Sequence, residues 1–131
     1  MKKIIGLMVV FLSLNSCIKK PVEGVRVVDV TTYETQLKQP NIQLIDVRTP
    51  AEYAEGHIAN SKNINITGED FDEQVALLNK SKPVMLYCKS GMRSAKASLR
   101  LKELGFENIT DLEGGFNNWS ESGKPIQDRL V

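Results

Sequence analysis

This sequence has almost no excess of charge of either sign, no long apolar run, and only two cysteines and one histidine. Its 17 lysines and arginines nearly balance 16 aspartates and glutamates, and the formal net charge is +1. This balance argues against a nucleic-acid partner, because phosphate binding needs a basic excess. No apolar run reaches the roughly 20 residues that a membrane-spanning helix needs. What remains is 131 residues with 41% hydrophobic content, which is typical of a single globular domain.

The N-terminal residues have the pattern of an export signal. Met1 is followed by the cationic pair Lys2-Lys3, and residues 4–14 form an apolar run that suits the core of a signal peptide. The run ends in Leu14-Asn15-Ser16-Cys17, which resembles the cleavage box of bacterial lipoproteins. The resemblance implies cleavage before Cys17 and lipidation of that residue, and several acyl chains anchor a protein stably. The alternative is an ordinary secretory signal in which Cys17 occurs by chance.

This pattern predicts the location and the cysteine chemistry of the protein. We expect a lipoprotein signal peptide over residues 1–16, a lipidated tether over residues 17–24, and export to the periplasm or the cell surface. With Cys17 lipidated, only Cys88 keeps a thiol, so no internal disulfide can form. One histidine and one remaining cysteine cannot supply a closed zinc site, and we expect neither a metal nor another cofactor.

Short β-rich runs alternate with helical patterns in the rest of the chain. The expected strands are residues 25–30, 42–47, 62–66, 83–87 and 109–112. Helices are expected after Thr31, after Thr49, after residues 67–70, over residues 94–104 and after Gly114-Gly115. The helix after Thr49 has the clearest start, because Pro50 suits the first helical position and Glu52 completes a capping box. We expect residues 57–61 to form a loop and the residues from Gly123 onward to be loosely held.

Strands that alternate with helices imply a parallel sheet that helices cover on both faces. We therefore predict an α/β fold with a small parallel sheet flanked by helices on both faces. Ligands of such sheets bind beyond the carboxyl ends of the strands. Cys88 follows the predicted buried strand at residues 83–87, which makes it the leading candidate for a functional residue.

The segment from Cys88 to Ser94, with the sequence CKSGMRS, has the features of an anion-binding loop. Backbone N–H groups of a short glycine-containing loop can point inward, and the positive end of the following helix adds to their field. Lys89 and Arg93 add positive charge, and the loop itself contains no acidic residue. These effects favour the thiolate of Cys88 over the thiol, and the thiolate is the nucleophile.

The length of this loop helps to choose the reaction. Four residues separate Cys88 from Arg93, one fewer than in phosphatases that use a cysteine nucleophile. The shorter loop has room for one sulfur atom above the cysteine but fits a tetrahedral oxyanion poorly. This favours sulfur transfer over dephosphorylation or arsenate reduction. Spacing alone leaves open that Cys88 is a buried structural cysteine followed by a glycine turn.

Several stretches together resemble the single-domain rhodaneses over roughly residues 25–119. The matching stretches are Asp46-Val47-Arg48, Pro50-x-Glu52-Tyr53, Gly56-His57-Ile58, Tyr87-Cys88-x-x-Gly91-x-Arg93-Ser94, Leu104-Gly105-Phe106 and Leu112-Glu113-Gly114-Gly115 before Trp119. Each stretch alone is weak evidence, whereas the whole set in this order and spacing is highly specific. The resemblance implies a rhodanese-like domain over residues 25–122 and a C-terminal tail over residues 123–131.

The resemblance further implies a sulfurtransferase without a cofactor, in which Cys88 carries the sulfur as a persulfide. The thiolate would attack a donor such as thiosulfate, sulfite would leave, and an acceptor would then remove the sulfur. The loop amides would stabilise the persulfide, and the residues that bind substrate and persulfide would be Lys89, Ser90, Gly91, Met92 and Arg93. Lys89 and Arg93 are the candidates for holding the anionic donor. The alternative is a non-catalytic or slow module that binds a sulfur-bearing or redox partner.

Four further residues are expected to support the site: Asp46, Arg48, His57 and Ser94. His57 could act as a base, but in the matching motif it mostly ties a loop back near the strand end. Asp46 and Arg48 could touch the substrate, although an ion pair or a loop-bracing role fits them better. The expected partners are a small anionic sulfur donor, a thiol, cyanide or protein acceptor, and the membrane through the lipid anchor.

Overall fold

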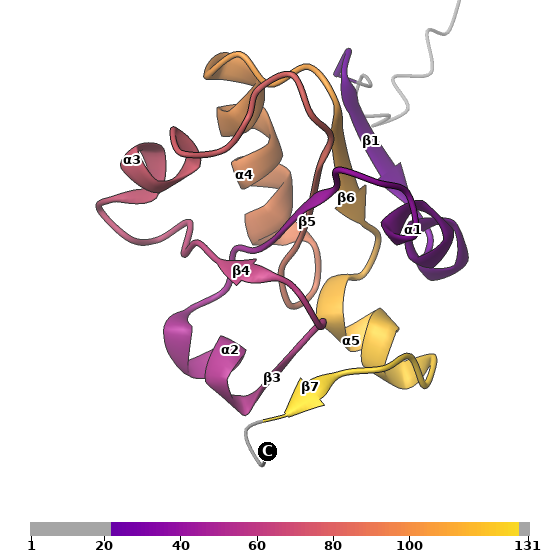
Figure 1. The fold of residues 1–131 in the computed structure, drawn as a ribbon. Coiled ribbons are helices and arrows are strands. Elements are labelled where there is room, and N and C mark those ends of the chain that lie inside the picture. Colours follow the sequence, from indigo (N-terminus) through magenta and orange to yellow (C-terminus); the bar gives the residue numbers. More distant parts are fainter. Residues whose placement is uncertain (1–21, 129–131) are drawn as a thin grey trace, which may run out of the picture.

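The computed structural model of the protein describes residues 22–128. The predicted signal peptide, Cys17, most of the predicted tether and residues 129–131 of the predicted tail lie outside the described residues. No described helix combines the length and the apolar character that crossing a bilayer would take. In the described part of the chain, helices surround a five-stranded sheet (Figure 1).

Five parallel strands form the central sheet. They are β1 (Val25–Val28), β2 (Gln43–Asp46), β4 (Lys62–Asn63), β5 (Val84–Tyr87) and β6 (Ile109–Leu112), in the order β1-β6-β5-β2-β4. Every predicted strand is present, and most are shorter than predicted. β5 lies between β6 and β2, and all of its residues are buried. This central strand ends directly before Cys88, as the sequence predicts.

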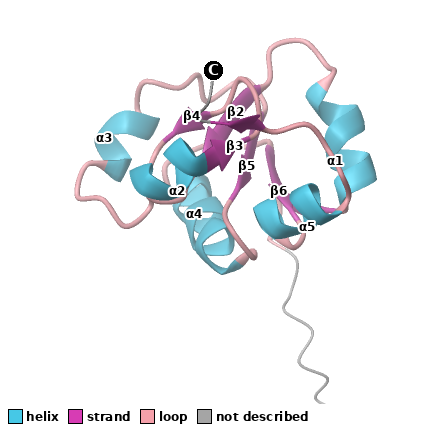
Figure 2. Ribbon diagram, turned by 90° about the horizontal axis from the view of Figure 1, so that it is seen from below, coloured by secondary structure: helices cyan, strands magenta, loops and turns pink. Residues whose placement is uncertain are grey.

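Helices cover both faces of the sheet. The helices are α1 (Val30–Leu37), α2 (Pro50–Glu55), α3 (Phe71–Val75), α4 (Met92–Glu103) and α5 (Gly115–Glu121). Side chains of α1 and α5 share one apolar cluster, and side chains of α3 and α4 share another. Figure 2 shows these two groups on opposite sides of the strands. The predicted α/β architecture is confirmed.

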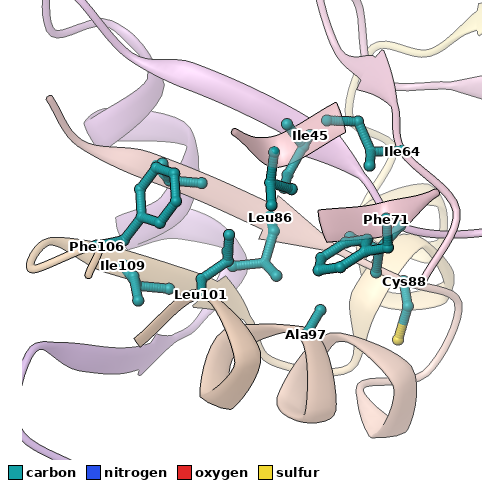
Figure 3. Packing of buried hydrophobic residues seen from close by; sticks show 12 residues of the cluster. Ile45, Ile64, Phe71, Leu86, Cys88, Ala97, Leu101, Phe106 and Ile109 are labelled. Atoms are coloured by element: carbon teal, nitrogen blue, oxygen red, sulfur yellow. The ribbon is translucent and has the colours of Figure 1, made fainter. Parts of the chain in front are cut away.

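Successive strand residues fill the two cores alternately, as expected for buried strands. Leu86 of β5 and Ile109 of β6 point toward α4, where they pack with Ala97 and Leu101 (Figure 3). Met85 and Tyr87, the neighbours of Leu86 in sequence, fill the core under α1 and α5. Cys88 lies at one end of the apolar core between the sheet and α4, beside the first turn of that helix (Figure 3).

Two helix starts differ from prediction, because the observed caps lie closer to the preceding strands. Asp29 caps α1 in place of Thr31, and its Oδ1 accepts a hydrogen bond from the Thr32 amide at 2.8 Å. α4 begins at Met92, two residues before the predicted start. Gly91, with a φ of 114°, allows the chain to turn sharply into this helix.

A second, two-stranded sheet lies where the sequence predicts a loop and a loosely held tail. β3 (Gly56–His57) pairs antiparallel with β7 (Gln127–Asp128). Before β7, the Pro125 carbonyl accepts a hydrogen bond from the indole N–H of Trp119 at 2.8 Å. The residues up to Asp128 are therefore fastened to the domain. These contacts join distant segments, so no local pattern in the sequence reveals them.

Candidate active site

Cys88 is buried at the carboxyl end of β5, at the start of the loop that leads into α4. Its relative exposure is 1%. The Sγ atom accepts a hydrogen bond from the Gly91 N–H at 3.0 Å. The hydroxyl oxygen of Ser94 lies 3.4 Å from the same sulfur atom. One inward-pointing amide thus donates to the sulfur atom, and the Ser94 oxygen accepts from the thiol.

The first turn of α4 places the Gly91 amide and the Ser94 hydroxyl beside the sulfur atom. The positive φ of Gly91 points its N–H back toward Cys88, and the Ser94 hydroxyl donates to the Gly91 carbonyl at 3.2 Å. Ser94 is fully buried on the sheet side of α4. Of the other predicted loop residues, Lys89, Ser90 and Met92 have exposed side chains, whereas Arg93 is half-buried.

The first turn of α5 holds the loop from the other side. The N–H groups of Phe116 and Asn117 donate to the carbonyls of Cys88 and Lys89 at 2.8 and 3.0 Å. This approach requires a glycine at position 115, because a Cβ there would lie 2.5 Å from the Cys88 carbonyl oxygen. Gly115 also has a φ of 61°, a region that favours glycine. Gly115 of the Gly-Gly pair therefore allows α5 to hold the loop after Cys88, a role that spacing alone did not reveal.

Arg93 is held by Glu52, from the first turn of α2. Its Nη1 and Nη2 atoms donate to the two carboxylate oxygens of Glu52 at 2.7 and 2.9 Å. The guanidinium holds the pKa of Glu52 down at about 2, and Glu52 raises the pKa of Arg93. The predicted capping box between Thr49 and Glu52 is present and fixes the start of α2. Sequence reasoning missed this acid as a partner of Arg93 because the two residues are 41 positions apart.

Asp46 and Arg48 form a buried ion pair at the end of β2. Arg48 Nη2 lies 2.7 Å from Asp46 Oδ2 and donates to the Gly56 carbonyl at 2.6 Å. The guanidinium also lies over the ring of Phe116, 4.2 Å from its centroid. This one side chain therefore ties together β2, β3 and α5. The contacts of Arg48 are those of a residue that holds the loops around the site in place, which is the role that the sequence favoured over substrate contact.

His57 is tied to Tyr53 at the end of α2. Its Nδ1 lies 2.8 Å from the Tyr53 carbonyl oxygen, and the two rings stack with centroids 3.7 Å apart. No hydrogen bond joins His57 to Cys88 in the part of the chain that the structure describes. These contacts are those of the structural role, in which His57 holds a loop near the strand end.

A cavity of about 380 Å³ opens beside the active-site loop, between α2, β3 and α5. Its lining includes Arg48, Glu52, Glu55, Lys89, Phe116 and Glu121. Arg48 and Glu52 are engaged in the ion pairs described above. Lys89 lines the cavity without an ion-pair partner among residues 22–128. Over the same residues, no group of three or more His, Cys, Asp and Glu side chains is placed to hold a metal ion.

Known proteins resemble this chain over most of its described length. The sequence model of one family, described as Rhodanese-like domain, matches residues 29–122. Thiosulfate sulfurtransferase 18 of Arabidopsis thaliana is 34% identical over 116 residues, which cover 79% of this chain and 85% of that protein. The uncharacterized protein YqhL of Bacillus subtilis is 39% identical over 77 residues, and the match spans 59% of this chain and 60% of that protein.

Solved structures share the fold. The crystal structure of a rhodanese-related protein from Thermoplasma volcanium superposes with a TM-score of 0.69 at 35% identity, covering 78% of this chain and 97% of that one. The solution structure of the polysulfide-sulfur transferase homodimer from Wolinella succinogenes has a TM-score of 0.67 at 33% identity, covering 82% and 81%. The matches by sequence and by structure thus point to the same kind of protein.

Proposed function

This chain belongs to the family of rhodanese-like domains, and from this premise we propose that it is a sulfurtransferase that carries sulfur as a Cys88 persulfide. The observation that carries the proposal is the hydrogen bond that the Gly91 amide donates to the sulfur atom at 3.0 Å. This donor suits a thiolate, the reactive form of cysteine. Relatives named as thiosulfate and polysulfide sulfurtransferases support the assignment.

The proposed reaction consists of two displacements at sulfur. The Cys88 thiolate attacks the outer sulfur of a donor such as thiosulfate and forms a new S–S bond. The old S–S bond breaks, and its electron pair leaves on sulfite. A cyanide or thiolate acceptor then attacks the outer sulfur of the persulfide, and the electron pair of that bond returns to Cys88. The Gly91 amide, next to the sulfur, stabilises the negative charge at the start and at the end of this cycle.

Lys89 is our candidate for drawing the anionic donor toward the loop. Its side chain is exposed, lines the cavity beside Cys88 and has no ion-pair partner within residues 22–128. The charge of Arg93, the second candidate from the sequence, is offset by Glu52. We therefore assign initial attraction of the donor to Lys89, and assign to Arg93 mainly the anchoring of α4 to α2.

Mass spectrometry of the reduced protein after incubation with thiosulfate tests the proposal. We expect a gain of one sulfur atom that cyanide removes and that Cys88→Ser abolishes. Cys17→Ser is the matched control, because it removes the other cysteine and should leave the gain intact. A folded wild-type protein that gains no sulfur from thiosulfate or from polysulfide would contradict the proposal.

The burial of Cys88 favours a second candidate function, a module that binds a sulfur-bearing or redox partner with slow turnover. A sulfur atom in a residue that is 1% exposed can be reached only through the surrounding loop. Thiocyanate formation from thiosulfate and cyanide separates the two functions. An enzyme forms many equivalents of thiocyanate per protein, whereas the binding module stops after a stoichiometric amount.

We also propose that the protein is exported and anchored through a lipid on Cys17, which lies outside the described residues. The support is the sequence pattern that ends in Leu14-Asn15-Ser16-Cys17. Expression of the full chain in a bacterium supplied with a radioactive fatty acid tests this. We expect label in the wild-type protein, recovered with the membranes, and no label in Cys17→Ala. An unlabelled wild-type protein would contradict the proposal.

A further inference from the structure

The chain enters the central sheet at the edge opposite Cys88. β1 runs parallel to β6, and β6 runs parallel to β5, so the three strands start at the same edge of the sheet. Cys88 follows the end of β5 and therefore lies at the other edge. In Figure 1 the start of β1 and the last turn of α4 lie at the top, whereas α2 and α5 lie at the bottom.

The loops at these two edges form two separate surfaces. The entry edge comprises the loops that lead into β1, β2, β5 and β6, which are residues 22–24, 38–42, 79–83 and 104–108. The site edge comprises the loops that follow the strands of the central sheet, which are residues 29, 47–49, 64–70, 88–91 and 113–114. The first surface contains the point where the chain enters the sheet, and the second contains Cys88.

Cations gather at the entry edge. Its loops contain three exposed lysines, and two further cations reach these loops from β1 and from the last turn of α4. Nζ of Lys102 lies 3.0 Å from the position that a Cβ on Gly24 would take. Arg26 Nη2 donates to Oδ1 of Asn108 at 3.4 Å. The five cations are Arg26, Lys38, Lys80, Lys82 and Lys102, and none of them has an ion-pair partner within residues 22–128.

Few acids oppose these cations. The loops of the entry edge contain Glu23 and Glu107, both of which are exposed. Asp72 and Glu103 lie beside the second half of α4, and both are bound to Arg100. When Arg100 is counted with the other cations, six cations meet four acids, so the entry edge keeps a net positive charge.

The site edge has the opposite sign. Its loops contain four exposed acids, which are Asp29, Glu69, Asp70 and Glu113. Of its two cations, Lys89 is exposed, and Arg48 is neutralised by its ion pair with Asp46. All 16 acidic residues of the chain lie within residues 22–128, whereas five of the 17 basic residues lie outside this range. An anionic surface therefore repels the domain as a whole and attracts only its entry edge.

We propose that the entry edge is a docking surface for an anionic membrane, on which the domain rests with Cys88 facing the water. Residues 18–24 separate Cys17 from β1, so a lipid on Cys17 keeps the start of β1 within about 28 Å of the membrane. Each lysine or arginine at an anionic lipid surface strengthens binding about fivefold. The proposal rests on the proposed lipid anchor only for bringing the domain to the membrane, because the attraction itself comes from the described cations.

The charges fix the orientation of the domain as well as its binding. Anionic headgroups attract the entry edge and repel the acids of the site edge, so both ends of the domain favour the same arrangement. The sulfur donor and the acceptor then reach Cys88 from the water, and Lys89 stays available to attract the donor. This arrangement suits a water-soluble acceptor and not one that is embedded in the membrane.

Acetylation of lysines by sulfosuccinimidyl acetate, followed peptide by peptide by mass spectrometry, tests the proposal on the full chain bound to vesicles. One set of vesicles contains equal parts of phosphatidylglycerol and phosphatidylcholine, and the other contains phosphatidylcholine alone. On the anionic vesicles we expect Lys38, Lys80 and Lys82 to react roughly fivefold more slowly or less, while Lys89 and Lys96 keep their rates. Salt at about 1 M, where the Debye length is about 3 Å, should remove the protection.

Lys80→Glu combined with Lys82→Glu reverses two charges of the entry edge. We expect Lys38 in this variant to react equally fast on both kinds of vesicle. Lys62→Glu combined with Lys96→Glu is the matched control, because it changes the net charge by the same amount at two exposed lysines outside the entry edge. In this control Lys38 should stay protected on the anionic vesicles. Loss of protection in both variants would mean that net charge, and not the entry edge, decides the binding.

Equal rates of the entry-edge lysines on the two kinds of vesicle overturn the proposal. Protection of Lys89 in their place also overturns it, since the site edge would then face the lipid, and so does a chain that fails to sediment with the anionic vesicles. The intact mass of the same sample shows whether Cys17 carries acyl chains. A chain without acyl chains that still shows protected Lys80 and Lys82 would refute the lipid anchor and leave this inference standing, whereas an acylated chain without protection would do the reverse.

Discussion

Arg93 and Glu52 form a two-bonded ion pair that joins the first turn of α4 to the first turn of α2. Arg93 follows the loop after Cys88, and Glu52 belongs to the capping box at the start of α2. It removes much of the positive charge that the sequence appeared to place beside Cys88. It also gives α2, a short helix without a fully buried residue, a fixed position next to the loop.

Glu52→Gln should make the protein less stable at neutral pH by about 1 kcal/mol, a magnitude suited to a partly exposed ion pair. Glutamine keeps the capping box, so the change isolates the charge. The folded-state pKa of Glu52 is about 2, below its ordinary value of 4.5. Its ionic stabilisation is therefore fully present above about pH 4.5 and is lost as the pH falls toward 2. Urea unfolding at several pH values measures the difference between variant and wild type, which should shrink over this window.

Arg93→Gln supplies the control for this ion pair. In a protein that already lacks the Arg93 guanidinium, Glu52→Gln should cost much less, because the two substitutions remove the same interaction. Equal costs of Glu52→Gln with and without Arg93 would show that the carboxylate stabilises α2 by another route.

Gly115→Ala should disturb the active-site loop more than its backbone strain alone explains. The positive φ of Gly115 makes alanine unfavourable by roughly 1–2 kcal/mol. In addition, its Cβ would lie 2.5 Å from the Cys88 carbonyl oxygen and 2.7 Å from that of Lys89. We expect a larger loss in the free energy of unfolding than strain alone gives, together with a large drop in sulfur loading of Cys88.

Gly123→Ala is the matched control for the Gly115 substitution. Gly123 has a similar φ of 70°, but a Cβ there would meet no atom within 4 Å. We expect a loss of roughly 1 kcal/mol from strain and unchanged sulfur loading. A similar loss of loading in both variants would mean that the contact between the α5 turn and the loop does not matter for the chemistry.

Local signals predicted the elements well, because each depends on residues that are close in sequence. The buried strand before Cys88 is a short apolar run with turn residues on both sides, and the structure forms it as β5. The capping box at Thr49 and Glu52 is also local, and both of its hydrogen bonds are present. The position of Cys88 at a strand end follows directly from these patterns.

Features that join distant segments could not be predicted in the same way. Pairing of β3 with β7 depends on how the chain folds back after α5, and neither segment has a strong strand pattern of its own. Asp111 reads as one polar residue in a predicted strand, and its burial next to α4 appears only when the helix is in place. The sequence therefore pointed to Cys88 and its loop as candidates, but it revealed neither Glu52 as the partner of Arg93 nor the burial of the Asp111 carboxyl group.

Asp46→Ala should destabilise the protein by about 3–5 kcal/mol, because it leaves the buried guanidinium of Arg48 without its ion partner. Guanidinium chloride unfolding at neutral pH measures this loss. Asp72→Ala is the control, since Asp72 pairs with Arg100 on the exposed surface and its removal should change stability little. Comparable losses in the two variants would show that burial does not set the cost of breaking the Asp46–Arg48 pair.

Asp111→Asn should make the folded protein more stable at neutral and alkaline pH. The folded-state pKa of Asp111 is about 7, raised by burial from an ordinary value of 3.8. Between these two values the unfolded chain has lost its proton while the folded protein still holds it, so the wild type loses stability as the pH rises from about 4 to about 7. Asparagine removes this loss, and we expect a gain on the order of a few kcal/mol at pH 8 and little change below pH 4.

Asp29→Asn should give no such gain, because capping of α1 lowers the pKa of Asp29 and its contribution to stability grows as the pH rises through the acid range. Denaturant unfolding of the three proteins from pH 3 to pH 8 measures both slopes, and a stability of Asp111→Asn that runs parallel to the wild type would show that the carboxyl group is ionised in the folded protein as it is in the unfolded chain.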